Sequence, residues 1–392
     1  MHLTKFGRYY LGLVLLMIVA AANTKTNLLN LFTAFLLALV VLSWTMLKAN
    51  LGNLTVRIES PGEVFANEPF PVRYLISNQT IYPKFGLSLC DAQLKFSASD
   101  PHHRDFFTIA DVPPRSTAAV GHELVWPRRG VCIWNEIKIA SSFPFDLMAA
   151  TIHLKVAHEL VVLPKPRSYS HLPLPTKASM FREGSFVSSV TRTASQDFSG
   201  LREYQPGDSP KNIHWKASAR AEKLIVKEYE ENLPAGVSIV LDLFQEHYPD
   251  LQEDYLFEQA ISLAASLVWD VAHQGYLILF AQAQRVVRYG RGTEHAMEIL
   301  RGLAQADRRR DIGERSAVVQ AIAAIPNSTT AIFICFCLRP EIEEYFVALA
   351  ASGCQVIAIV LDERESAKAI AGVELYRLAG EQHDSLVLEK IS

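Results

Sequence analysis

The chain has 392 residues, of which 49% are hydrophobic and 20% charged, and its formal net charge is 38 − 41 = −3. This length predicts two or three folded units, and the composition excludes a disordered or fibrous protein. A net charge so close to zero argues against a dedicated nucleic-acid binder, so we expect no nucleic acid among its partners. The five cysteines lack metal-ligand spacing, which favours a reduced compartment and argues against zinc.

Residues 1–50 are strongly apolar and predict a membrane anchor in the lipid bilayer. Leu28–Leu47 is free of charged residues. Its length of about 20 residues corresponds to roughly 30 Å of helix, enough to cross a bilayer core. A soluble core helix of this length would need a polar face, and this segment has too few polar residues to make one. We predict transmembrane helices at about 6–23 and 28–47.

The first apolar stretch, Tyr9–Ala22, has two interpretations. It is short for a span, and with Lys5 and Arg8 before it, it resembles a signal peptide. We favour a retained helical hairpin in which the two basic side chains snorkel to the membrane surface. In both cases the chain after Lys48 faces the cytoplasm, in line with the positive-inside rule. We therefore expect a cell (inner) membrane protein with cytoplasmic soluble domains.

Residues 54–163 predict an antiparallel β-sandwich-like module. Leu54, Val56 and Ile58 alternate with polar residues, and Pro71–Asn78 repeats the strand pattern. Short strands at roughly ten-residue spacing, separated by Pro, Gly and Asn, are typical of such modules. The further predicted strands are Phe85–Leu89, Phe106–Ile109, Ala118–Leu124, Val131–Ile139 and Leu154–Leu163.

Residues 164–235 form a polar connection followed by the most distinctive segment of the chain. Pro206 and Gly207 favour a tight turn. Asp208, or the serine after it, suits a helix cap, so we predict a short helix that begins there. Ile213 and Trp215 are expected to give this helix apolar contacts.

The charged residues of this segment have mixed signs, which favours an ion-paired structural network or a docking surface. They are Arg202, Glu203, Asp208, Lys216, Arg220, Lys227, Glu228 and Glu230. A catalytic interpretation would pair Asp208 with His214 as acid and base near Arg220. It lacks a nucleophile, because the chain has no G-x-S-x-G or S-x-x-K sequence.

Several clusters of this segment resemble the signature of the domain-of-unknown-function family 58. The resemblance implies a membrane protein paired with a MoxR-type AAA+ ATPase, whose C-terminal part is similar to a von Willebrand factor type A domain. Together with the anchor, it favours a non-enzymatic adaptor without a cofactor, acting in protein assembly or remodelling. The matching residues are Gly200, Arg202, Tyr204, Pro206, Gly207, Asp208, Ile213, His214, Trp215, Arg220, Lys227 and Glu228.

Residues 236–392 predict a doubly wound α/β domain with helices on both faces of a parallel sheet. Val237–Asp242 is a continuous apolar run of the kind found in central parallel strands. Helices and strands alternate after it. Strands are expected at 276–281, 285–289, 330–337 and 355–361, and helices at 256–273, 295–305, 316–325 and 341–351.

Asp242 is a degenerate candidate for a metal site at the carboxyl end of the first strand. A magnesium-binding type A domain has Asp-x-Ser-x-Ser here, whereas this chain has Phe244 and Glu246 at the serine positions. Arg339 places a cation where another acid would help. We therefore expect no metal, and two alternatives stay open: a metal-dependent binding module at Asp242, or an unrecognised enzyme.

Overall fold

The computed structural model falls into two compact units, Met1–Pro164 and Lys165–Ser392, each described by itself. The structure describes residues 1–24, 26–91, 106–170, 172–174, 196–204, 213–221, 223–231, 236–242, 250–282, 285–306, 322, 325, 329–336, 338, 340–361, 369–382 and 385–391.

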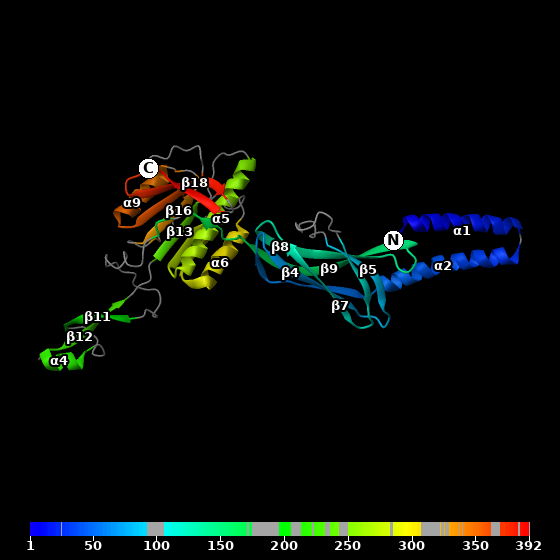
Figure 1. Ribbon diagram of the computed structural model, residues 1–392, viewed down its shortest axis with the longest axis horizontal. Coiled ribbons are helices and arrows are strands. Elements are labelled where there is room, and N and C mark those ends of the chain that lie inside the picture. Colours follow the sequence, from blue (N-terminus) through cyan, green and yellow to red (C-terminus); the bar gives the residue numbers. More distant parts are fainter. Residues whose placement is uncertain are drawn as a thin grey trace. The chain divides into compact units, whose positions relative to one another are not determined.

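Two long helices, α1 (Lys5–Thr24) and α2 (Asn27–Leu51), open the first unit and lie side by side (Figure 1). Both are long and apolar enough to cross a membrane. Most of their apolar side chains face outward; Leu28 is 80% exposed and Leu31 is 71% exposed. A helix in the core of a soluble protein would bury such side chains, so this hairpin has the surface of a helix pair that lipid surrounds.

The extreme N-terminus is tied to the β module. Strand β1 (His2–Leu3) pairs antiparallel with the start of β9 (Met148–Leu163). The Thr4 amide donates to the Leu147 carbonyl at 3.3 Å, and the Thr4 hydroxyl donates to the Asp146 carbonyl. Gly7 lies so close to the Leu147 carbonyl that a Cβ at this position would collide with it.

The other end of the hairpin is joined to the module just as firmly. The Asn50 side chain forms two hydrogen bonds with the Phe85 backbone, donating to its carbonyl at 2.7 Å and accepting from its amide at 2.8 Å. It also donates to the Ser141 hydroxyl at 2.9 Å. The buried Lys84 ammonium donates to the Ala49 carbonyl, and burial lowers the pKa of Lys84. The end of α2 is thus continuous with the module.

Two sheets form the β module, as the alternating pattern predicted. One consists of β2 (Leu54–Glu59), β4 (Pro69–Asn78) and β7 (Thr117–Val125), all antiparallel. The other has the order β1-β9-β8-β5-β6, built from antiparallel pairs, with β3 paired to β9 in parallel. The remaining strands are β3 (Glu63–Phe65), β5 (Lys84–Cys90), β6 (Phe106–Val112) and β8 (Gly130–Ser141).

Alternate residues of both sheets meet in one core. Val72, Tyr74 and Ile76 of β4 point into it, together with Leu87 of β5 and Trp134 of β8. Period-2 burial of this kind follows from the pleat of the strands, which sends successive side chains to opposite faces.

The carboxylate of Asp91 is buried in the core of the module. Oδ2 of Asp91 accepts hydrogen bonds from the Tyr74 hydroxyl at 2.7 Å and from the Trp134 indole nitrogen at 2.9 Å. Burial and the nearby Asp91 charge raise the pKa of the Cys132 thiol to about 11. Buried polar groups are stable only when paired, so this acceptor accounts for a tyrosine and a tryptophan in the core.

The second unit contains an eight-stranded sheet with the order β10-β19-β18-β17-β16-β13-β14-β15. Its five central strands, β14, β13, β16, β17 and β18, are parallel to one another. β14, β13, β16 and β17 are buried along almost their whole length, as expected for central parallel strands, whereas β18 is buried only in part. The strands are β10 (Ser168–Tyr169), β13 (Gly236–Asp242), β14 (Leu277–Gln282), β15 (Arg285–Gly290), β16 (Thr330–Cys335), β17 (Gln355–Val360), β18 (Val373–Gln382) and β19 (Ser385–Lys390).

The predicted all-parallel sheet is wrong at its edges. β15 is antiparallel to β14, and β19 is antiparallel to β18. In each case only two residues separate the strands, and a connection this short cannot form the crossover that parallel pairing needs. β18 and β19 were not predicted at all. The sheet is therefore mixed.

Helices lie on the sheet as the strand order requires. From β13 the chain passes through α5 (Asp250–His273) to β14 on one side, and from β16 through α9 (Pro340–Ala351) to β17 on the other. Right-handed crossovers in opposite directions place these helices on opposite faces (Figure 1). Phe346 of α9 packs on Phe333 of β16, while α6 (Gly292–Gln305) packs beside α5. The predicted helix at 316–325 lies almost wholly outside the described residues.

Candidate functional site

The signature segment forms a small structure of two strands and one helix. β11 (Gln196–Glu203) pairs antiparallel with β12 (Ile225–Glu231), and α4 (Trp215–Ala221) lies between them in the chain. The register places Gly200 opposite Glu228 and Arg202 opposite Val226, with a bulge between Phe198 and Gly200. We call β11, α4 and β12 the signature module.

His214 and Ser218 fasten α4 to β12. The His214 amide donates to the Ile225 carbonyl at 2.8 Å, and Nδ1 of its ring accepts a hydrogen bond from the Ala217 amide at 3.1 Å. His214 therefore caps the first turn of α4, and the same Ala217 amide also donates to the His214 carbonyl at 3.0 Å. The buried Ser218 hydroxyl accepts from the Ile225 amide at 2.9 Å and donates to the His214 carbonyl at 3.1 Å.

The remaining contacts of the signature module follow the backbone. The Tyr204 amide donates to the Leu224 carbonyl at 2.9 Å, and Ile213 forms an isolated bridge with Val226, which is 3% exposed. Lys227 lies opposite Leu201 in the strand pair. The strand pattern Leu224–Glu230 is thus reproduced by β12. The role of Ser218 could not be predicted from the sequence, because a serine in a seven-residue helix gives no indication of which strand it contacts.

Trp215 contradicts the sequence-based expectation. It was predicted to anchor the helix by apolar contacts, yet its side chain is 67% exposed. It occupies the first position of α4, and the side chain of this helix that forms a hydrogen bond with β12 is that of Ser218. Leu224 is also 46% exposed, and Lys216 and Arg220 are exposed on the same helix. An exposed tryptophan beside cationic side chains is typical of protein-docking surfaces.

Pro206, Gly207 and Asp208 lie outside the described residues, so the proposed pairing of Asp208 with His214 has no geometry to compare. The His214 ring itself is described, and its Nδ1 accepts the hydrogen bond that caps α4.

Asp242 ends β13 at the carboxyl edge of the sheet, where it is 5% exposed and opposite Cys335 in the register. Phe244, Glu246 and Arg339 lie outside the described residues. Within the described part of the chain, no group of three or more His, Cys, Asp or Glu residues is placed to hold a metal ion.

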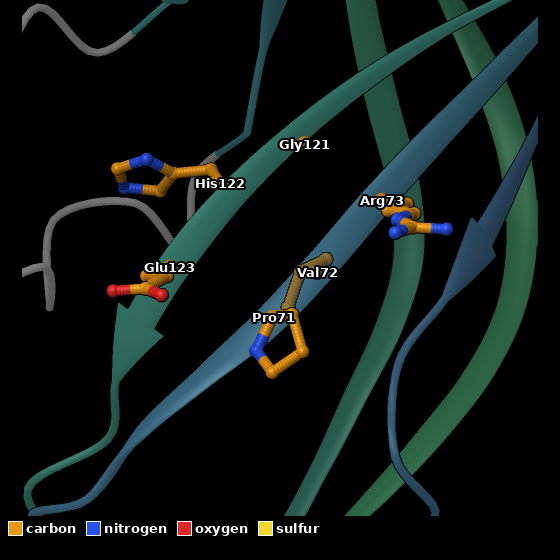
Figure 2. A pocket seen from close by; sticks show the side chains of 6 residues that line it. All are labelled: Pro71, Val72, Arg73, Gly121, His122 and Glu123. Carbon is orange, nitrogen blue, oxygen red and sulfur yellow. The ribbon is translucent and has the colours of Figure 1, made fainter.

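A shallow depression lies on β4 and β7 of the first unit, lined by Pro71, Val72, Arg73, Gly121, His122 and Glu123. Figure 2 shows that the His122 and Arg73 side chains point in opposite directions. The His122 ring contacts Phe107 at a centroid distance of 5.1 Å. Polar groups that bind a small molecule converge on one point, and these do not.

These features define a class of protein: a chain that begins with a hairpin of apolar helices, continues into an antiparallel β module and ends in a mixed α/β sheet preceded by the signature module. Residues 200–388 match the family described as "Protein of unknown function DUF58". This segment belongs to that family, and it contains most of the signature module and most of the α/β sheet. The resemblance found in the signature is thereby confirmed.

One curated relative is "Uncharacterized protein YeaD" of Bacillus subtilis (strain 168), which is 24% identical over 195 residues. The match covers 49% of this chain and 46% of the relative, so it spans less than half of the relative's length.

Solved structures give only weak similarities. The CARDB domain of PF1109 from Pyrococcus furiosus is 12% identical with a TM-score of 0.16, over 26% of this chain and 94% of that domain. A superoxide reductase (neelaredoxin) from Ignicoccus hospitalis is 18% identical with a TM-score of 0.16, over 29% of this chain and 90% of that protein. Similarities of this size say nothing about activity.

Proposed function

We propose that this protein is a membrane-anchored, non-enzymatic adaptor that binds a MoxR-type AAA+ ATPase during assembly or remodelling of another protein. The single observation on which the proposal rests is the exposure of Trp215 on the signature module. Tryptophan is enriched among the residues that dominate binding energy at protein interfaces, and leaving 67% of its side chain in water is unfavourable without a partner.

The hydrogen bonds of the signature module support a docking role. His214 and Ser218 use their polar atoms to fix α4 on β12, so the presentation of Trp215 is rigid before any partner binds. A preorganised surface loses less conformational entropy on binding, which favours affinity. We infer that the histidine is a structural residue of this surface.

The anchor supplies the membrane location of the proposal. The pairing of β1 with β9 and the contact of Gly7 with Leu147 favour retention of the first helix over its removal as a signal peptide. Lys5, Arg8 and Lys48 lie at the ends of the helices that meet the β module. By the positive-inside rule, we propose that the β module and the second unit are cytoplasmic.

The α/β sheet supports the proposed similarity to a von Willebrand factor type A domain. Starting from the edge, β15-β14-β13-β16-β17-β18 has the order 3-2-1-4-5-6 of doubly wound folds, and the order reverses between β13 and β16. Asp242 ends β13 beside this reversal, where ligands of such sheets bind. The described residues around Asp242 do not favour a metal over a protein ligand.

Co-purification tests the proposal. The full chain, solubilised in mild detergent, should recover a MoxR-type AAA+ ATPase, and Trp215→Ala should abolish the recovery. Tyr255→Ala is the matched control, because Tyr255 is 55% exposed on α5 of the same unit and should leave binding intact. Equal recovery of the ATPase with both variants would show that the signature module is not the docking surface. Absence of any AAA+ ATPase with the folded wild-type chain would refute the partnership.

A further inference from the structure

Four apolar or aromatic side chains face solvent where the β module meets the helical hairpin. Tyr82 is 68% exposed, Ile81 59%, Phe145 42% and Phe85 37%. We propose that these residues, the apolar collar, rest in the headgroup layer of the bilayer and hold the β module against the membrane surface. The inference depends on the anchoring proposed above and extends it from the helices to the soluble module.

All four residues lie at the foot of the hairpin. The backbone of Phe85 forms two hydrogen bonds with the side-chain amide of Asn50, one residue before the end of α2. The loop that contains Ile81 and Tyr82 begins at Gln79. The Gln79 amide donates to the carbonyl of Asn53, two residues after the end of α2, at 3.3 Å.

Phe145 also lies at the foot of the hairpin, beside the start of α1. It occupies the turn between β8 and β9, which receives the hydrogen bonds of Thr4 just before α1 begins. The ring of Phe143 in the same turn lies 5.2 Å from that of Phe85. The collar therefore surrounds the points where both helices meet the module.

The depth of the helices places the collar at the lipid headgroups. α2 has 25 residues, which corresponds to about 37 Å and exceeds a hydrocarbon core of about 30 Å. Trp44, with the Lys48 ammonium 3.9 Å from its ring centroid, has the side-chain type found at membrane boundaries. From Trp44 to Leu51 the helix rises about 10 Å, slightly more than the roughly 5–8 Å of headgroup region on each side of the hydrocarbon core, so the foot of the module lies at the outer part of that layer.

The loop that presents Ile81 and Tyr82 is rigidly held. The side-chain amide of Asn78, which is 2% exposed, donates to the carbonyls of Tyr82 at 2.8 Å and Val112 at 3.2 Å. Its carbonyl oxygen accepts from the Thr80 amide at 3.0 Å. A loop organised by a buried amide keeps two large apolar side chains outward, which is unfavourable in water and favourable at a lipid surface.

The charges beside the collar suit a membrane surface. Lys5, Arg8 and Lys48 flank the helix ends, and Arg115 donates its amide to the Thr80 carbonyl at 3.0 Å with its side chain exposed. Asp111 lies opposite Phe85 in the strand register, and Asp146 follows Phe145 in the turn that accepts the Thr4 hydrogen bonds. Four cations thus accompany two carboxylates among the residues named here. Anionic headgroups attract such basic clusters, and aromatic rings are favoured at the same depth.

Site-specific photocrosslinking in proteoliposomes tests the proposal. The probe is p-benzoylphenylalanine placed at one position of the full-length chain, reconstituted in phosphatidylethanolamine and phosphatidylglycerol vesicles. The collar positions are Tyr82 and Phe145. The matched control is Ile133, which is 51% exposed on β8, eight residues or about 26 Å along the strand from Ser141 at the foot of the module. Phe35, 58% exposed on α2, reports on the anchor.

We expect lipid adducts, detected as a mass increase, at Tyr82, Phe145 and Phe35 and none at Ile133. Adducts at Phe35 without adducts at Tyr82 and Phe145 would overturn the collar while leaving the anchor intact. Absence of adducts at Phe35 would overturn the anchor and the collar with it. Crosslinks from Tyr82 to a second copy of the chain, in place of lipid, would show a protein interface and also overturn the proposal.

Discussion

Removal of the buried carboxylate of Asp91 should destabilise the β module strongly. In Asp91→Ala, the hydroxyl of Tyr74 and the indole N–H of Trp134 both lose their acceptor, and both residues are at most 1% exposed. A buried donor without a partner costs about 1–3 kcal/mol, so two such donors should cost about 2–6 kcal/mol of unfolding free energy. Asp91→Asn keeps an oxygen at the same position and should cost about 1–2 kcal/mol.

Denaturant unfolding of the full chain in nanodiscs, followed by tryptophan fluorescence, measures these differences. In the Asp91→Ala background, Tyr74→Phe removes a donor that no longer has a partner and should restore about 1 kcal/mol, whereas the same change in the wild type should be destabilising. If Asp91→Ala and Asp91→Asn were equally stable, the assignment of Asp91 as the acceptor of both donors would be refuted.

Three further predictions concern other parts of the chain. Gly7→Ala should detach the N-terminus from the β module by collision with the Leu147 carbonyl, seen as faster proteolysis at the N-terminus; Gly12→Ala, with open space around its Cβ, should leave the N-terminus attached. Stability should fall as pH rises from about 9 to about 11, because burial and the Asp91 charge raise the pKa of the folded Cys132 thiol from its ordinary value to about 11. Cys132→Val should reduce this loss of stability, and an unchanged pH profile would contradict the assignment. Ser218→Ala should leave a strand amide of the signature module unpaired and accelerate its hydrogen exchange roughly tenfold, and unchanged exchange would show that the serine does not fasten α4.

Much of the architecture follows from local pattern in the sequence. The apolar run Leu28–Leu47 predicted α2, because a helix that crosses lipid needs a long uncharged segment. Alternation predicted β4, and the continuous apolar run at Val237–Asp242 predicted β13, because burial on one or two faces leaves a direct trace in the residue order. The signature clusters predicted the family.

The candidate site was only partly predictable. The signature identified the segment and its strand at 224–230, yet it assigned Trp215 to the interior, where the structure exposes it. A tryptophan two residues after an isoleucine is predicted to be buried by its local sequence pattern. Only the docking of Ser218 on Ile225 determines which side of a two-turn helix faces inward.

Tertiary structure alone decided how the parts are joined. Nothing near Thr4 in the sequence indicates a hydrogen bond to Asp146, 142 residues away, and nothing near Asn50 indicates Ser141. Asp91 became the acceptor for Tyr74 and Trp134 only when the two sheets closed over it. The periodicity of apolar residues predicts which residues are buried, because it depends only on the local element. Partners far apart in the chain are determined by how whole elements pack together, and this packing produces no local sequence pattern.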